Sequence, residues 1–111
     1  MALTRDFKKT IQARVQRDQR FRKALLREGT ECLLAGEIET GKAFLRDFVN
    51  ATVGFTSLAR VTRHSTKSLM RMLGPNGNPN ARSLFEIIAY LQQVEGVRLQ
   101  VRSVPRQRQV A

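Results

Sequence analysis

Two basic side chains, Lys67 and Arg71, have the residue type and the spacing to read the edges of base pairs. They are four residues apart, so on a helix they are neighbours on one face. Thr66 belongs to the same face. An arginine can bind guanine O6 and N7 with two hydrogen bonds, and a lysine can donate to the same acceptors. The chemistry available to this face is therefore hydrogen bonding to a duplex.

Two short helices joined by a turn would have to position that face. Apolar residues occur before and after a polar run at 62–65, and Ala59 is small enough to lie where two helices touch. Ser65 can cap the second helix by accepting a hydrogen bond from the amide of Ser68. In a helix-turn-helix the first helix supports the second, whose exposed face enters the major groove. The pattern predicts this motif between Phe55 and Pro79.

The rest of the chain is predicted to be mainly helical. Apolar periodicity and capping residues predict helices at about 4–16, 18–36, 38–53 and 81–94, which with the two of the motif makes about six. Past Gly96, the alternation over 97–102 predicts one short C-terminal strand, which needs a partner in this chain, in a second copy or in another protein. We expect a single domain over 1–111: a helical extension at 1–36, a helix-turn-helix bundle at 37–95, and a strand with a basic tail at 96–111.

The charge distribution favours a polyanionic partner. The chain of 111 residues has a formal net charge of +11, and no acidic residue lies between Asp47 and Glu86. A phosphate-facing surface explains such a block better than a set of unrelated solvated arginines. No apolar run reaches the ~18 residues of a membrane span. The charges also do not form the long polar face of a lipid-binding helix, so we expect no membrane partner.

Catalysis and metal binding are not expected from this composition. His64 is the only histidine and Cys32 the only cysteine, which excludes a multi-histidine metal site, a cysteine cluster and an internal disulfide. Glu37 and Glu39 are better placed to favour a helix dipole than to work as an acid–base pair. We therefore predict a protein that is not an enzyme, without cofactor or metal, in the reducing cytoplasm.

The longer string of residues around the motif resembles one known family. Leu58-Ala59, then Ser65-Thr66-Lys67-Ser68-Leu69, then Gly77-Asn78-Pro79 follow the spacing of lambda-repressor-like (XRE) helix-turn-helix proteins. The run from Lys67 to Pro79 looks like the addiction-module antidotes, the HigA-like antitoxins of type II toxin–antitoxin pairs. The stronger match covers about 44–95.

This resemblance implies a set of DNA contacts. Thr66, Lys67 and Arg71 would read bases. Residues that would contact phosphates are Ser65, Ser68, Asn76 and Asn78, and the basic residues Arg60, Arg63 and Arg82 of the acid-free block are compatible with the same role. The chain departs from the family pattern at the turn, where Arg63 replaces the usual glycine and Thr62 and His64 replace apolar residues. Phe55 stands where relatives often have a polar residue that touches DNA, and we expect it in the core.

The function implied by the resemblance is that of a sequence-specific antitoxin. Such a protein represses its own operon as a homodimer on double-stranded DNA and neutralises a small RelE/HigB-type toxin. The N-terminal helices and the 97–102 strand are the two candidate surfaces for the toxin. One alternative is a free-standing XRE-type repressor without a toxin. Another is a small basic RNA-binding protein, which the scarcity of available aromatic side chains makes less attractive.

Overall fold

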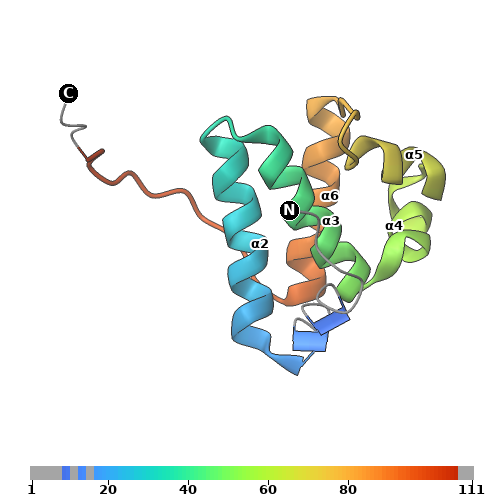
Figure 1. The fold of residues 1–111 in the computed structure, drawn as a ribbon, viewed down its shortest axis with the longest axis horizontal. Coiled ribbons are helices and arrows are strands. Elements are labelled where there is room, and N and C mark those ends of the chain that lie inside the picture. Colours follow the sequence, from blue (N-terminus) through green and yellow to red (C-terminus); the bar gives the residue numbers. More distant parts are fainter. Residues whose placement is uncertain (1–8, 11–12, 15–16, 108–111) are drawn as a thin grey trace.

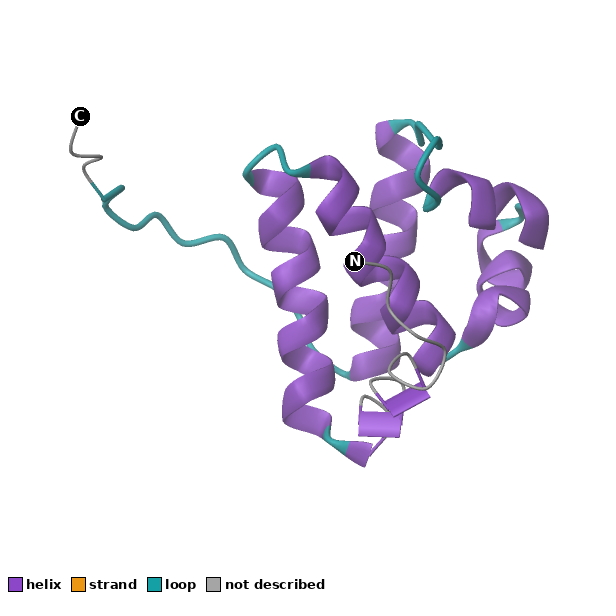
Figure 2. Cartoon of the chain, in the orientation of Figure 1, coloured by secondary structure: helices purple, strands orange, loops and turns teal. Residues whose placement is uncertain are grey.

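The described part of the chain is a bundle of helices. The computed structural model describes residues 9–10, 13–14 and 17–107. Within these ranges it contains five helices and no strand (Figures 1 and 2). The helices are α2 (Gln19–Leu34), α3 (Ile38–Ala51), α4 (Gly54–Thr62), α5 (Thr66–Met72) and α6 (Ala81–Glu95).

The predicted capping residues set the beginnings of α2 and α6 and the end of α6. Asp18 caps α2 by accepting a hydrogen bond from the Phe21 amide at 3.1 Å, and Asn80 caps α6 through the Ser83 amide at 2.8 Å. Gly96 ends α6 in the left-handed conformation, with φ +70°. A glycine adopts this conformation without the steric cost that a Cβ atom brings. The predicted bundle is thus confirmed for these five helices.

The helices α2 and α3 form a close antiparallel pair on one side of the molecule (Figure 1). Gly41 lies buried at their crossing, and a Cβ atom there would come within 2.7 Å of the Leu33 side chain. A larger residue would push the two helices apart. This close approach explains a glycine near the start of α3, where it otherwise weakens the helix.

One apolar core joins all five helices. Each helix contributes at least one buried side chain, among them Leu26 of α2, Phe48 of α3, Leu58 of α4, Leu69 of α5 and Leu91 of α6, all with no exposed surface. Full burial of such a side chain contributes about 1.5–3 kcal/mol. Phe55 is also buried, as expected from the sequence, and is 6% exposed.

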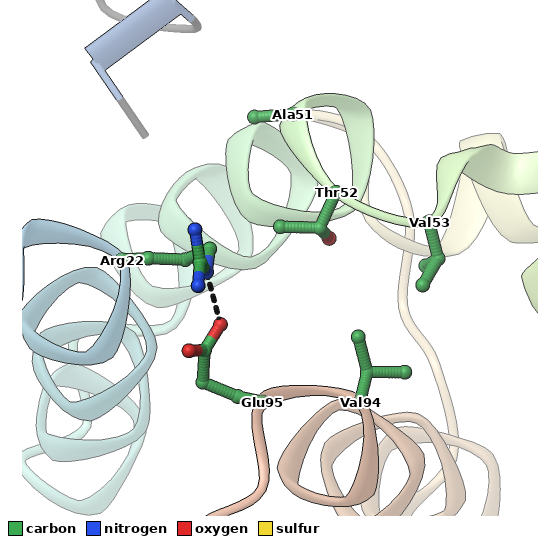
Figure 3. Close-up of a pocket in the computed structure, with 6 residues that line it drawn as sticks. All are labelled: Arg22, Ala51, Thr52, Val53, Val94 and Glu95. Atoms are coloured by element: carbon green, nitrogen blue, oxygen red, sulfur yellow. Dashed lines mark hydrogen bonds and ion pairs between the residues drawn. The ribbon is translucent and has the colours of Figure 1, made fainter. Parts of the chain in front are cut away.

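An ion pair joins the beginning of α2 to the end of α6. The Arg22 guanidinium donates to the Glu95 carboxylate (Figure 3). The Glu95 side chain is only 2% exposed. A carboxylate buried to this degree needs a partner, because removing a charge from water is costly unless it is paired. The contact therefore fixes the two helix ends relative to each other.

The predicted strand at 97–102 is wrong for the chain described here. The Val97 amide donates to the Gln92 carbonyl at 3.0 Å, and the Leu99 amide donates to the Gln92 side chain at 2.8 Å. Val97 and Leu99 pack against the core, which accounts for the alternating pattern. Beyond them the chain leaves the bundle and Val101 is 83% exposed. The described residues offer no sheet edge for a strand to join.

The predicted N-terminal helix at 4–16 lies mostly outside the described residues, and a sixth helix is not shown. Residues 9, 10, 13 and 14 within that range are helical. Among the described residues, no helix has the length and apolar character needed to cross a membrane.

Candidate nucleic-acid interface

The turn between α4 and α5 has the left-handed residue that a helix-turn-helix uses. Arg63 directly follows α4 with φ 60° and ψ 26°, and it is the one non-glycine residue with positive φ in the described ranges. The chain keeps this backbone geometry although it lacks the glycine that the family pattern has at this place. The strain of a side chain in this conformation is of order 1–2 kcal/mol.

The helix α5 is held at its beginning and buried along one side. The Ser65 hydroxyl oxygen accepts a hydrogen bond from the Ser68 amide at 3.0 Å, which confirms the predicted cap. Leu69 and Leu73 have no exposed surface. The opposite side of α5 faces solvent with Lys67, Met70 and Arg71. The side chains predicted to read bases thus lie on an accessible face, with Thr66 half-buried beside them.

The turn also packs against the start of α6. His64 Nε2 lies 3.3 Å from the hydroxyl of Ser83, within hydrogen-bond distance, and Ser83 is buried. This contact places the exposed residues at the start of α6, including Arg82, beside the turn that carries Arg63. A polar residue at position 64 therefore has a structural role, where the family pattern has an apolar one.

A buried lysine of α3 holds the loop that follows α5. Lys42 is 1% exposed, and its ammonium group donates to the carbonyls of Gly74 at 3.0 Å and Gly77 at 2.7 Å. The Glu39 carboxylate lies 3.0 Å from the same nitrogen. These partners satisfy the three donors of an ammonium group. Arg46, one turn further along α3, donates to the Leu73 carbonyl at 3.1 Å.

Gly77 brings the loop into contact with the last turn of α5. A Cβ atom on Gly77 would lie 1.8 Å from the Arg71 carbonyl oxygen and 2.7 Å from that of Met72. No other residue type fits this position without displacing the backbone. The two predicted contact residues Asn76 and Asn78 belong to this loop, and both are exposed.

Apart from Ser68, which lies on α5 itself, the predicted phosphate contacts are on three segments around this helix. They lie at the end of α4 and in the turn, in the loop after α5, and at the start of α6 (Figure 1). Arg60, Arg63 and Arg82 all reach the surface, as does Ser65, whereas Ser68 is half-buried. Arg82 lies 3.5 Å from the Glu86 carboxylate, but with its side chain 90% exposed this pair is weak. The arrangement is a polar and basic rim around the exposed face of α5.

Sequence reasoning missed the residues that support this rim. Lys42 and Arg46 looked like ordinary charged positions on an amphipathic helix, since their partners are 27 to 35 residues further along the chain. One local signal was present: Lys42 has apolar or small neighbours, Gly41, Ala43 and Phe44, on an otherwise charged stretch. That signal alone does not specify a partner.

A second candidate site is a hollow of about 310 Å³ next to the Arg22–Glu95 ion pair (Figure 3). Ala51, Thr52, Val53 and Val94 complete its lining. The two charged groups are bonded to each other and so stabilise the bundle. Among the described residues, no group of three side chains able to bind a metal comes together.

Comparison with known proteins adds no relative to this picture. No protein-family model matches the chain, and neither a curated protein nor a solved structure matches it.

Proposed function

We propose that this protein binds double-stranded DNA and represses transcription, with α5 as the recognition helix. The observation that carries this proposal is the exposed face of α5, where Lys67 and Arg71 lie one turn apart on a helix whose other side is fixed in the core. A rigid helix that presents donors at this spacing suits bidentate contacts in the major groove. The surrounding arginines and asparagines are suited to phosphate oxygens.

The proposal extends to an antitoxin because of the resemblance of Lys67 to Pro79 to the addiction-module antidotes. On this proposal the protein acts in the cytoplasm, binds its own promoter as a homodimer and neutralises a RelE/HigB-type toxin. A two-fold dimer would place two copies of α5 about 34 Å apart, one helical turn of the duplex. The helix α2 and the extended segment after Gly96 are available for the toxin, because both lie away from α5 (Figure 1).

The runner-up within DNA binding is a repressor without a toxin, and the neighbouring gene separates the two. An antitoxin requires an adjacent gene for a small ribonuclease-like protein. Expression of that gene alone should arrest growth, and co-expression with this chain should restore growth. If expression of the neighbouring gene caused no growth arrest, the antitoxin proposal would be contradicted and the repressor proposal would remain.

An RNA-binding function is less well supported by the arrangement of aromatic side chains. Single-stranded RNA is bound largely by stacking of bases on exposed aromatic rings. Phe48 and Phe55 are buried, and Phe21 and Phe44 are half-buried against the core. Phe85 is the one exposed phenylalanine among the described residues, and Arg82 lies one turn before it, but a stacking platform uses several aromatic rings.

A binding experiment tests the DNA proposal. Fluorescence anisotropy on the protein's own upstream DNA, with random duplex and RNA as competitors, should show preference for the upstream sequence. Lys67→Ala and Arg71→Ala should each cost about 1–3 kcal/mol of specific binding and relax the choice of base. Arg27→Ala is the matched control, because it removes one exposed positive charge from α2. Equal competition by RNA, or equal weakening in the control, would contradict the proposal.

A further inference from the structure

The helix α6 exposes a large aromatic side chain beside its buried face. Ile87, Ile88 and Leu91 point into the core, whereas Phe85 is 60% exposed. One turn further along the helix, at Ala89, the surface is hollowed between α4 and α6. The hollow has a volume of about 270 Å³ and is lined by Val61, Thr62, Glu86, Ala89, Tyr90 and Gln93.

We define the α4–α6 face as Val61, Phe85 and the lining of this hollow. Val61 is itself 52% exposed, so an aromatic and an aliphatic side chain both face solvent here. Apolar side chains that gather on a monomer surface mark sites of association more often than isolated ones do. The α4–α6 face is therefore a candidate surface for association.

Charge makes this face suitable for a second copy of the same chain. Two copies with a net charge of +11 each repel one another over most of their surface. The α4–α6 face is an exception, because Glu86 is its one charged residue and lies 3.5 Å from Arg82 of the same helix. Association through this face places few like charges against each other.

Shape points to the same partner. In a two-fold dimer one surface contacts itself, so it must contain both a protrusion and the hollow that receives it. Phe85 is the protrusion, and the hollow begins one turn away on the same helix face. Two α6 helices that cross antiparallel at Ala89 place position 85 of one copy opposite position 93 of the other. Ala89 is small and exposed, which permits close approach at the crossing.

We infer that the α4–α6 face is a homodimer interface in which Phe85 of each copy enters the hollow of the other. The inference names a surface for the homodimer proposed above, but it does not require DNA as the ligand. Val61 lies two residues before the left-handed Arg63. The interface thus contacts α4 directly before the turn that sets the direction of α5, and it would fix two recognition helices relative to each other.

Other groups of exposed apolar side chains are less suited to this role. Leu34 and Ile38 lie on either side of the turn between α2 and α3, where Glu31, Glu37 and Glu39 are also exposed, so a second copy there would bring like charges together. Met70 lies between Lys67 and Arg71 on α5, so a second copy there would meet two positive charges and cover the candidate DNA face. Val101 and Val104 lie on a segment with Arg98, Arg102 and Arg106. Pairing of this segment with its copy would place like charges side by side.

Sedimentation velocity of the full chain without DNA tests the inference. The protein should dimerise as its concentration rises, and Phe85→Glu should weaken dimerisation about tenfold or more, because truncation of a central aromatic anchor is costly. Val101→Glu is the matched control, since it makes a similar exchange at a more exposed position, and it should leave dimerisation unchanged. The inference would be overturned if the parent chain stayed monomeric, or if Val101→Glu weakened dimerisation more than Phe85→Glu did.

Cross-linking provides a second measurement that does not rely on a destabilising change. In a Cys32→Ala background, Ala89→Cys should oxidise to a disulfide-linked dimer, because residues at the crossing of a two-fold pair approach closely enough. Gln100→Cys, also exposed, is the control and should stay monomeric. Cross-linking of Gln100→Cys but not of Ala89→Cys would show that the copies meet elsewhere. Since neither measurement includes DNA, failure here is distinct from failure of the DNA proposal.

Discussion

At the scale of single residues, Arg63 has the most strained backbone conformation in the motif. Its φ of 60° lies in the left-handed region, which costs a residue with a Cβ atom roughly 1–2 kcal/mol. Replacement by glycine removes this strain. However, glycine loses more backbone entropy on folding, which costs about 0.5–1 kcal/mol. The relief of strain is the larger of the two effects.

We therefore expect Arg63→Gly to raise the free energy of unfolding by about 0.5–1 kcal/mol. Urea denaturation followed by circular dichroism would measure the change. Arg60→Gly is the control, because position 60 is inside α4, where glycine should lower stability by about 1 kcal/mol. If both variants were destabilised alike, the left-handed conformation would not be a cost to this chain.

The thiol of Cys32 gives a residue-scale prediction about pH. Burial raises the pKa of the Cys32 thiol, and the nearby Glu37 carboxylate raises it further through its charge and a hydrogen bond. A raised pKa lowers the thiolate fraction at neutral pH, and the thiolate is the reactive form. Alkylation of Cys32 should thus be slow near pH 7 and accelerate as the pH rises.

Glu37→Gln should shift the alkylation profile of Cys32 to lower pH, because it removes the nearest negative charge. Rates of modification by iodoacetamide, measured over a pH series, would show the shift. Glu39→Gln, which also removes one acidic charge but is not among the groups that act on Cys32, should leave the profile in place. Identical profiles for the parent chain and Glu37→Gln would contradict this cause.

At the scale of elements, α3 holds the end of α5 and the loop after it. Lys42 and Arg46 bind three carbonyls there. The Leu73 carbonyl belongs to the C-cap of α5, and the Gly74 and Gly77 carbonyls belong to the loop, so the two side chains fix this segment against α3. The short helix α5 is stable in this position because of these contacts and its buried leucines.

We expect Lys42→Met to lower the free energy of unfolding by about 1.5–3 kcal/mol. Methionine retains an apolar chain of similar length but leaves the carbonyls of Gly74 and Gly77 without their charged donor. Arg46→Met, which removes one hydrogen bond from a half-buried side chain, should cost about 1 kcal/mol. Urea denaturation of both variants would show which of them loses more free energy of unfolding. A larger loss for Arg46→Met would contradict the prediction.

At the scale of the whole molecule, the two basic segments that lack acidic residues lie at opposite ends. The helices α4 and α5 form one end, and the segment after Gly96 leaves the bundle beyond α2 at the other (Figure 1). One duplex lying along α5 would meet Arg60 and Arg63 but would be far from Arg102. The DNA proposal uses only the first of these two segments.

The dependence of DNA binding on salt should reflect this division. A plot of log K against the logarithm of the salt concentration has a negative slope. Removal of one side chain that neutralises a phosphate makes this slope less steep by about 0.9. Arg60→Ala should therefore reduce the slope by about one unit, with an equal effect on specific and random duplexes. Arg102→Ala removes the same charge from the distant end and should change the slope much less. Equal slopes for the two variants would mean that the duplex does not lie along α5.

The sequence by itself determined the helices and the two sides of α5. Caps and terminal glycines act within three or four residues, so Asp18, Ser65 and Asn80 could be recognised as helix starts. Apolar periodicity likewise separates Leu69 and Leu73 from Lys67 and Arg71. These features are local, and local pattern is what a sequence displays directly.

The tertiary structure decided what depends on residues far apart in the chain. It showed that the alternation at 97–100 reflects packing of Val97 and Leu99 on the helices, without a strand. It also paired His64 with Ser83, and Lys42 with a loop 32 to 35 residues away. Apolar periodicity along the sequence indicates which side of an element is buried. A hydrogen bond between distant segments depends instead on how the elements are packed together in the fold. Such contacts hold α5 in place, and they became visible only when the chain was folded.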